Sequence, residues 1–163
     1  MILASFEGQL CLCDWKYRKM RMAVDNRIKG GLGSEYFEES TVVIRKAIDQ
    51  LEEYFAGERK EFGIQLLMVG TSFQNQIWNE LINIPYGETE SYLGLSHRIS
   101  NKKAIRAVAA ANGANALSIF VPCHRIIGSR GELVGYAGGT GAKKKLLQLE
   151  GAITKDTQLE IFE

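Results

Sequence analysis

Residues 117–127 read LSIFVPCHRII, an apolar run that leads directly into a cysteine, a histidine and an arginine. The run over 117–121 is typical of a short buried strand, which would place Cys123 just beyond the end of that strand. Pro122 fixes its own φ at about −65° and makes the approach to the thiol rigid. The stretch therefore predicts a cysteine held in one geometry at the end of a buried element.

Cys123 has the neighbours that nucleophilic chemistry requires. A thiol with an ordinary pKa of about 8.5 is only a few per cent ionised at neutral pH, so neighbours such as His124 and Arg125 must favour the thiolate. His124 can accept the thiol proton, directly or through a water. Glu150 follows an expected helix over 143–149 and is a candidate to orient the imidazole. The alternative is a buried, inert cysteine beside a surface histidine.

Three helices are predicted between residues 71 and 113. Thr71 and Gln74 have the spacing of a capping box, and the helix that they begin has an apolar face of Phe73, Ile77, Trp78, Leu81 and Ile82. A second helix is expected at about 91–99. After a polar break at 100–101, a third is expected from Lys102 to about Asn112, with Gly113 as a left-handed terminator. Two helices with so short a break are a candidate helix-turn-helix.

The third helix is basic on one side and thin. Lys102, Lys103 and Arg106 share a face, and alanines at 104, 107, 109, 110 and 111 would let the helix approach another backbone closely. The alternative is that the alanines only pack helix on helix. Nine basic residues and one acidic residue between 98 and 145 give this segment a net charge of +8. Such a segment suits a polyanionic partner if folding gathers the charge, and is otherwise a solvated surface balanced by acids elsewhere.

The first part of the chain is predicted to be a small mixed domain. Strands over 1–6 and 10–15 would form a hairpin, 18–24 would continue the sheet, and 29–34 would be a flexible loop. The next elements are a helix over 44–55 ended by Gly57, and a last strand over 62–68. Gly70-Thr71-Ser72 resembles a linker. We therefore expect domains at 1–69 and 70–152 and a tail at 153–163.

Composition limits the class of protein. The 163 residues are 45% hydrophobic and can bury a core, but no apolar stretch approaches the ~20 residues that span a bilayer, and the start lacks a signal peptide. A cytoplasmic protein is expected. Three cysteines argue against a disulfide framework. Cys11 and Cys13, two apart in a strand, should share one face and point into the core, and a metal role is disfavoured because neither histidine lies nearby.

Six blocks of sequence resemble the O6-alkylguanine-DNA alkyltransferase family in order and spacing. They are Ile84-Pro85-Tyr86-Gly87-Glu88-Thr89, Arg106-Ala107-Val108, Ala111-Asn112-Gly113-Ala114-Asn115, Val121-Pro122-Cys123-His124-Arg125-Ile126-Ile127, Gly135-Tyr136-Ala137-Gly138-Gly139 and Leu146-Leu147-Gln148-Leu149-Glu150-Gly151. The resemblance covers about residues 71–151. It implies an α+β protein, with a loosely matched ribonuclease-H-like α/β domain followed by a winged helix-turn-helix-like catalytic domain.

The resemblance also implies roles for catalytic residues. Cys123 would accept the alkyl group, His124 would deprotonate it through a water, Glu150 would partner His124, and Asn115 would complete the network. Tyr92 would press on a phosphate to help the nucleotide rotate, and can also donate a proton to guanine O6. Two positions depart from the family's pattern without removing a catalytic group: Ala116 stands where proline is usual, and Thr140-Gly141 replaces a commoner apolar residue.

The implied partner is double-stranded DNA that contains alkylated guanine. Arg106 would fill the space of the base flipped through the minor groove, and the other implied DNA contacts are Lys102, Lys103, Ala107 and Arg125. The implied guanine pocket is lined by Val121, Tyr136, Ala137 and Gly138. We expect a monomer that needs no cofactor, no metal and no membrane.

The implied function is direct-reversal repair, in which the alkyl group moves irreversibly to Cys123 and each molecule acts once. O4-alkylthymine is a second candidate substrate. One alternative is a non-catalytic DNA-binding module, although such proteins carry another residue where Cys123 stands. Another is a cysteine hydrolase, which would need an oxyanion hole and access for water.

Overall fold

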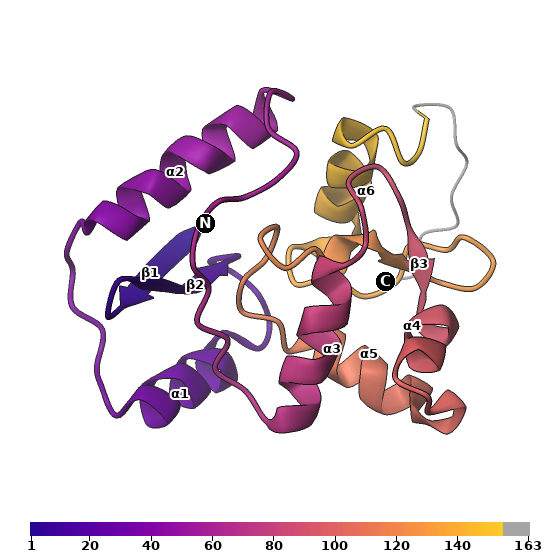
Figure 1. Ribbon diagram of the computed structural model, residues 1–163, viewed down its shortest axis with the longest axis horizontal. Helices are drawn as coiled ribbons and strands as arrows, with labels where there is room; N and C mark the ends of the chain where they lie inside the picture. The colour runs from indigo at the N-terminus through magenta and orange to yellow at the C-terminus, as the bar shows by residue number, and fades with distance from the viewer. Residues whose placement is uncertain (155–163) are drawn as a thin grey trace.

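The computed structural model describes residues 1–154, except for the side chain of Lys102, so the expected tail lies largely outside the described residues. Its elements are β1 (Ile2–Phe6), β2 (Gln9–Asp14), α1 (Arg21–Leu32), α2 (Val42–Phe55), α3 (Ser72–Ile82), β3 (Glu90–Ser91), α4 (Tyr92–Arg98), the 3₁₀ turn η1 (Lys102–Ala104), α5 (Ile105–Gly113), the 3₁₀ turn η2 (Cys123–Arg125), β4 (Ile126–Ile127) and α6 (Gly139–Leu149). This mixture confirms the α+β class. The β1–β2 hairpin lies between α1 and α2, and the helices from α3 onward form the other half of the molecule (Figure 1).

The hairpin is confirmed, and its second strand is buried on both sides. Strands β1 and β2 pair antiparallel around Glu7-Gly8, both of which have positive φ. Cys11 and Cys13 are both buried, as predicted, but the prediction that they share one face was wrong, since they pack in different clusters of core side chains. The register of the pairing shifts between Ala4 and Ser5 and leaves Cys11 as an extra residue, so the alternation of a regular strand is broken there.

The prediction for 18–34 was wrong, because helix α1 replaces both the extra strand and the loop. Val24 and Ile28, four residues apart, are buried, and Arg21 and Asp25 form an ion pair with Nη2 2.6 Å from Oδ1. Gly33, with φ 60°, ends the helix. Gly31 lies inside the helix where a Cβ would meet Val69 Cγ1 at 2.5 Å, so close packing explains this glycine.

Two further predictions about strands and helix ends need correction. Residues 62–68 form only an isolated bridge to β2, between Leu66 and Leu10. The Leu10 N–H donates to the Gln65 carbonyl, and the Leu67 N–H donates to the Leu10 carbonyl, both at 2.9 Å. Gly113 is not a left-handed terminator but the last residue of α5, and the C-cap residue that follows it, Ala114, has φ −84°. The Ala114 N–H donates to the Ala110 carbonyl at 3.0 Å, so the end of the helix needs no residue in the left-handed region.

The helices of the second half follow the predicted pattern, except that the helix expected from Lys102 begins as the 3₁₀ turn η1 and is α-helical only from Ile105. Thr71 and Gln74 form both hydrogen bonds of the capping box, and α4 and α5 flank a short break as expected for a helix-turn-helix. Trp78 in α3 donates its indole N–H to the Ala111 carbonyl at 2.9 Å, which ties α3 to α5. No helix in the described part of the chain is long and apolar enough to cross a membrane.

The two halves share one core. A single cluster of buried side chains includes Leu10 and Tyr54 from the first half, and Ile77, Leu95 and Leu146 from the second. The domain boundary at residue 70 stays a prediction, but buried side chains from both sides of it pack in one cluster.

Candidate active site

Residues 117–121 form a tight buried turn, so the predicted strand was wrong. The Val121 N–H donates to the Leu117 carbonyl at 2.8 Å, and the Cys123 N–H donates to the Val121 carbonyl at 2.8 Å. Ile119, at the centre of the turn, has φ 76°, a strained conformation for a β-branched residue, and it is fully buried. An apolar run indicates burial but not strand geometry, which explains the error.

Asn115 connects this turn to the thiol. Its Nδ2 donates to Cys123 Sγ at 3.1 Å and to the Val121 carbonyl at 2.9 Å, while its Oδ1 accepts from the Leu117 N–H at 2.9 Å. Asn115 is itself buried, and Cys123 is 3% exposed. The structure therefore brings these two predicted residues together, with the amide N–H facing the sulfur.

His124 and Glu150 form a buried pair next to the thiol. His124 Nε2 lies 2.8 Å from Glu150 Oε1, and both side chains are fully buried. The carboxylate accepts only, so the Nε2–H donates and Nδ1 is left as the acceptor of the ring. Nδ1 has no hydrogen-bond partner among the described residues. Burial lowers the pKa of His124 while Glu150 partly restores it, so the imidazole is neutral at pH 7 and able to take a proton.

Arg125 is a structural partner of Glu150 rather than a surface residue. Its Nε donates to Oε2 at 2.8 Å, Nη2 donates to Oε1 at 2.9 Å, and Nη1 donates to the Ile84 carbonyl at 2.6 Å. The guanidinium is thus fully engaged inside the protein, away from the DNA-contacting position that we predicted for it. Burial alone would raise the pKa of Glu150, but hydrogen bonds from His124 and Arg125 bring it down to about 2.

Tyr54 is a partner of Glu150 that the sequence did not suggest. This residue of α2 is fully buried, and its hydroxyl donates to Glu150 Oε1 at 2.7 Å. In sequence it belongs to the apolar face of a helix nearly one hundred residues away. Only the folded arrangement of the two halves brings it to the carboxylate.

Lys143 is a second residue that the sequence did not single out. It is fully buried on α6, and its Nζ donates to the Val134 carbonyl at 2.8 Å. Burial lowers the pKa of Lys143 to about 8, while Cys123 opposes this shift. Its spacing to Leu146, Leu147 and Glu150 places it on the buried face of α6, which is the clue available in the sequence.

The charges around the thiol act in opposite directions. Burial raises the pKa of Cys123, while the Asn115 hydrogen bond and the Lys143 charge lower it. The net shift is upward, so the thiol is protonated at neutral pH. A proton acceptor is therefore required for reaction, and His124 is the neighbouring neutral base.

Two tyrosines lie within electrostatic reach of the thiol. Strand β3 pairs parallel with β4, directly after η2, and so brings Tyr92 at the start of α4 toward Cys123. Burial and the Cys123 charge raise the pKa of Tyr92 to about 12, although the side chain of Asn112 opposes this shift. Burial also raises the pKa of Tyr136, whose ring meets His124 edge to face with centroids 6.3 Å apart. Both hydroxyls are therefore protonated at neutral pH.

The loop after Tyr136 packs under Trp15 from the first half. The centroids of the Trp15 and Tyr136 rings are 5.9 Å apart and the ring planes make an angle of 74°. A Cβ at Gly138 would lie 2.4 Å from Trp15 Cε2. Ala137 is half-buried and Val121 is fully buried. Trp15, which the sequence did not indicate, thus packs against Tyr136 and Gly138, two of the predicted pocket residues.

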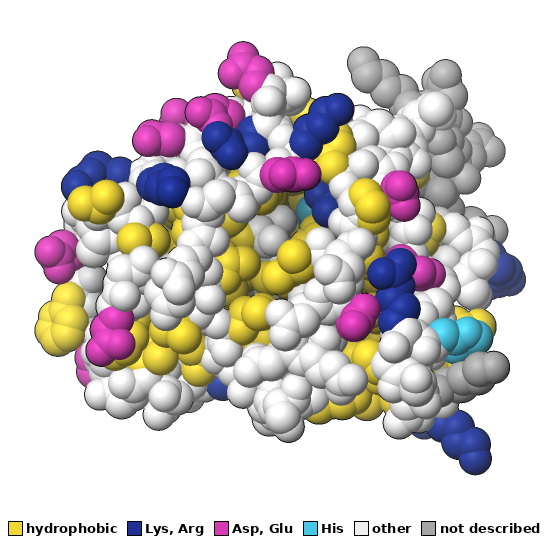
Figure 2. Space-filling model, viewed as in Figure 1, with side chains coloured by type: hydrophobic (Ala, Val, Ile, Leu, Met, Phe, Trp, Pro, Cys, Tyr) yellow, Lys and Arg dark blue, Asp and Glu magenta, His cyan; other side chains and the backbone are white. Residues whose placement is uncertain are grey.

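The predicted DNA-contacting residues of η1 and α5 are exposed where the structure describes their side chains. Lys103, Arg106 and Ala107 are exposed, while the side chain of Lys102 lies outside the described residues. The +8 segment is not one patch, because Arg125 and Lys143 are interior. On the face shown in Figure 2, basic and acidic side chains are interspersed rather than separated by sign.

Comparisons with known proteins agree on one family. The model of the family described as "6-O-methylguanine DNA methyltransferase, DNA binding domain" matches residues 72–152. The chain is 51% identical over 114 residues to a methylated-DNA–protein-cysteine methyltransferase of Methanosarcina acetivorans, covering 70% of this chain and 73% of the relative. It is 50% identical over 108 residues to the constitutive enzyme of that name from Bacillus subtilis, covering 66% of each chain.

Solved structures extend the likeness to almost the whole chain. The structure of Mycobacterium tuberculosis OGT in complex with DNA is similar with a TM-score of 0.79 and 39% identity, covering 92% of this chain and 85% of that one. An O6-methylguanine-DNA methyltransferase from the archaeon Pyrococcus kodakaraensis shares the fold, with a TM-score of 0.66 and 24% identity. The structural likeness therefore includes the first half of the chain, which the six blocks of sequence do not cover.

Proposed function

The chain belongs to the O6-methylguanine DNA methyltransferase family, and from this premise we propose that it repairs DNA by moving an alkyl group from guanine O6 to Cys123. The observation that carries the proposal is the thiol itself, with Sγ 3.1 Å from Asn115 Nδ2 beside the His124–Glu150 pair at 2.8 Å. The bond from O6 to the alkyl carbon breaks as the bond from Sγ to that carbon forms. The guanine stays in the DNA strand and becomes the unmodified base once it regains a proton.

The proton of the thiol passes to His124. Glu150 holds the Nε2–H, so Nδ1 accepts the proton, directly or through a water, and the carboxylate stabilises the resulting imidazolium. The Asn115 amide and the Lys143 ammonium favour the thiolate as it forms. Tyr92, protonated at neutral pH, supplies a proton to the departing guanine O6.

Each molecule acts once. The product is a thioether, which has no good leaving group, so the alkyl group stays on Cys123. Burial raises the pKa of Cys11 and Cys13 as it does that of Cys123, but the Asn115 hydrogen bond and the Lys143 charge that favour the thiolate act on Cys123. The protein is consumed in proportion to the lesions that it repairs, and this chemistry calls for no cofactor.

The partner is double-stranded DNA carrying O6-alkylguanine. An alkyl carbon inside the stacked duplex is out of reach, so the nucleotide must be flipped at a cost of a few kcal/mol. We assign Arg106, on the exposed side of α5, to the space left by the base, and Lys102, Lys103 and Ala107 to the surrounding backbone. Val121, Tyr136, Ala137 and Gly138 are assigned to the pocket. A monomer and a cytoplasmic location stay predictions.

Intact mass and peptide mapping after incubation with a duplex containing O6-methylguanine test the function. We expect one added methyl group, located on Cys123. Binding without an adduct would instead indicate a recognition module, and released product with repeated turnover would indicate a hydrolase.

A further inference from the structure

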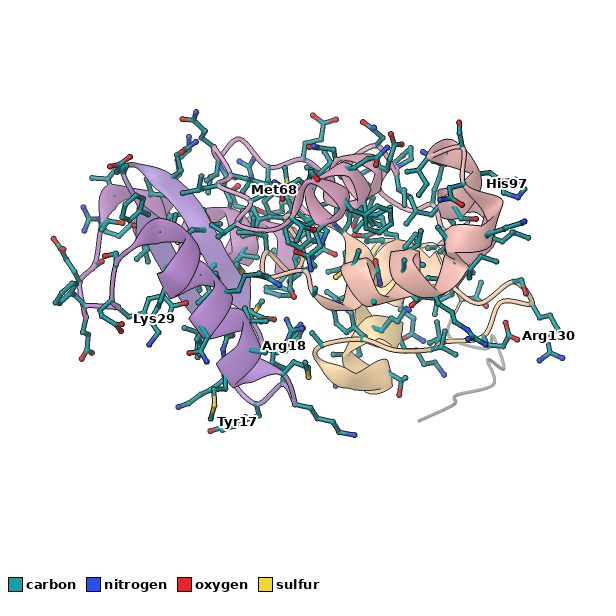
Figure 3. All side chains as sticks on the ribbon, turned by 90° about the horizontal axis from the view of Figure 1, so that it is seen from below. Tyr17, Arg18, Lys29, Met68, His97 and Arg130 are labelled. Carbon is teal, nitrogen blue, oxygen red and sulfur yellow. The ribbon has the colours of Figure 1, made fainter. Side chains whose placement is uncertain are left out.

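A buried ion pair from the first half of the chain contacts the active-site turn. Asp14 ends β2 and is 0% exposed, and Arg18, in the turn before α1, is 6% exposed. Figure 3 shows Arg18 turned in toward the body of the molecule, while the neighbouring Tyr17 projects away from it. Arg18 Nη1 lies 2.7 Å from Asp14 Oδ2.

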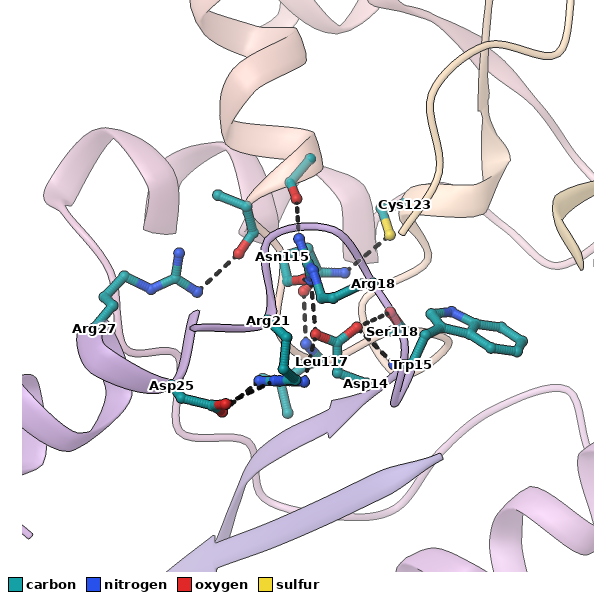
Figure 4. A network of polar contacts seen from close by, with 12 residues as sticks. Asp14, Trp15, Arg18, Arg21, Asp25, Arg27, Asn115, Leu117, Ser118 and Cys123 are labelled. Atoms are coloured by element: carbon teal, nitrogen blue, oxygen red, sulfur yellow. Dashed lines mark hydrogen bonds and ion pairs between the residues drawn. The ribbon is translucent and has the colours of Figure 1, made fainter. Parts of the chain in front are cut away.

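Arg18 also holds the backbone on which Asn115 is mounted. Its Nη1 donates to the Asn115 carbonyl at 2.8 Å, and its Nη2 donates to the Gly113 carbonyl at 2.5 Å (Figure 4). One guanidinium therefore satisfies two carbonyls at the end of α5. The planar fork of arginine suits this task, because its donors point in fixed directions.

Asp14 reaches the same turn from the other side. Its Oδ1 accepts from Ser118 Oγ at 3.3 Å and from the Trp15 N–H at 2.8 Å, and its Oδ2 also accepts from Arg21 Nη1 at 3.0 Å. The backbone of β2 adds a further contact, since the Cys13 N–H donates to the Ala116 carbonyl at 2.9 Å. The segment between Gly113 and Ser118 is thus fixed at several points by the first half.

We propose that Arg18 and Asp14 are positioning residues for alkyl transfer, which hold Asn115 so that its amide N–H faces the thiol of Cys123. The proposal rests on the proposed role of Cys123 as the alkyl acceptor. It explains a buried ion pair that contributes little to stability by itself, because desolvation offsets much of the attraction between such charges. The first half of the chain is then part of the catalytic apparatus without touching substrate.

The positioning role of Asp14 can be separated from the effect of its charge, because the two have opposite effects on the rate of transfer. The negative charge of Asp14 opposes thiolate formation, and the positive charges of Arg18 and Lys143 favour it. The other titratable groups near the thiol are Tyr92 and His124, together with Tyr136. If charge alone mattered, Asp14→Asn would ease ionisation and speed the reaction. If Asp14 holds the turn, the same variant slows it.

The experiment measures transfer from free O6-benzylguanine as a function of pH, which removes DNA binding from the readout. We expect Arg18→Met and Asp14→Asn to slow transfer about tenfold or more, in the range seen when supporting contacts of a reactive group are lost. The thiol should ionise at a higher pH in both variants. Arg18→Lys should restore the rate only in part, because it keeps the charge but loses the fork.

Arg59→Met is the control. Arg59 is also an arginine of the first half that pairs with a carboxylate, Glu53, and its Nη1 donates to the Glu61 carbonyl at 2.8 Å, so these partners lie away from the segment between Gly113 and Ser118. We expect its rate and pH profile to match those of the wild type. Near-UV circular dichroism and thermal melting identify any variant that is not folded at the assay temperature. If Arg18→Met is unfolded, Asp14→Asn and Arg18→Lys decide the question.

Three results would overturn the proposal while leaving the function intact: faster transfer by Asp14→Asn, unchanged pH profiles in the folded Arg18 and Asp14 variants, or an equal loss in Arg59→Met. A wild-type protein that gains no benzyl group on Cys123 would instead contradict the proposed function itself.

Discussion

Glu150 is the carboxylate that binds three other side chains of the site. Its two oxygens accept hydrogen bonds from Tyr54, His124 and Arg125 at 2.7 to 2.9 Å. Sequence position suggested that Glu150 serves His124, but not that an arginine and a tyrosine compete for the same carboxylate. The imidazolium formed during transfer thus shares Glu150 with the Arg125 guanidinium, whose charge lowers the pKa of His124.

The first prediction concerns acid stability. The pKa of Glu150 is about 2 in the folded protein and ordinarily 4.5, so its contribution to folding is full above pH 4.5 and is lost as pH falls toward 2. This loss amounts to about 3 kcal/mol of unfolding free energy. Glu150→Gln lacks the titration, although it leaves Arg125 without its ionic partner and is less stable at neutral pH.

Urea unfolding at a series of pH values measures this effect. The stability of the wild type should exceed that of Glu150→Gln at pH 7, and the gap should narrow between pH 4.5 and 2. A gap that stays constant over this range would show that Glu150 is not held in its ionised form by the fold.

The residues that the sequence identified differ in kind from those it missed. Cys123, His124, Asn115 and Glu150 lie in blocks of sequence with a local pattern. Tyr54, Arg18 and Trp15 act across the two halves, and no spacing in the chain predicts which distant residue meets the turn. Burial also reverses the reading of Arg125, because a basic residue looks like a surface group until its partner is known.

At the level of elements, α1 shows how a helix can escape sequence analysis. Only Val24 and Ile28 of its residues are buried, and Gly30 and Gly31 suggested a loop. Tertiary contacts hold it instead, through Arg21 and Asp25 and through close packing on Val69. The helices with a full apolar face, α2 and α3, were predicted to within about two residues.

The second prediction uses this glycine pair. A Cβ at Gly31 would lie 2.5 Å from Val69 Cγ1, whereas a Cβ at Gly30 would have no atom within 4 Å. Gly31→Ala should therefore destabilise the protein by about 1 to 3 kcal/mol through overpacking. Gly30→Ala should stabilise it by about 0.5 to 1 kcal/mol through helix propensity. Thermal melting compares the two, and a stabilised Gly31→Ala would mean that α1 does not pack on Val69 as described.

The third prediction concerns α5 as a DNA-contacting element. Arg106 is exposed on this helix and is assigned to fill the gap left by the flipped guanine. Arg106→Ala should slow repair of methylated duplex by about tenfold or more while leaving transfer from free O6-benzylguanine nearly unchanged, because the free base needs no flipping. Equal losses on the two substrates would refute this assignment.

Lys103→Ala is the control for Arg106. This exposed lysine is assigned to phosphate, so its loss should reduce the slope of log affinity against log salt concentration by about one unit. Its reactivity with the free base should stay that of the wild type. The pair of variants separates base replacement from charge.

At the scale of the whole molecule, the two halves behave as one structure. They share a core cluster, Tyr54 and Arg18 cross from the first half to the site, and Trp15 covers the loop at Gly138. The sequence predicted the α+β class and the order of most elements. It could not predict this union, because contacts between Asp14 and Ser118, or between Tyr54 and Glu150, depend on how the halves dock.

Single use of Cys123 is the fourth prediction and the central claim about the molecule. A fixed amount of protein is titrated with duplex containing O6-methylguanine, and the methyl groups removed are counted and mapped to peptides. We predict removal up to one methyl group per protein molecule, a plateau that excess DNA does not lift, and every adduct on Cys123. Cys123→Ser should remove none, since a hydroxyl is a far weaker acid and nucleophile than a thiol. Removal of more than one methyl group per molecule, or an adduct on Cys11 or Cys13, would contradict the account.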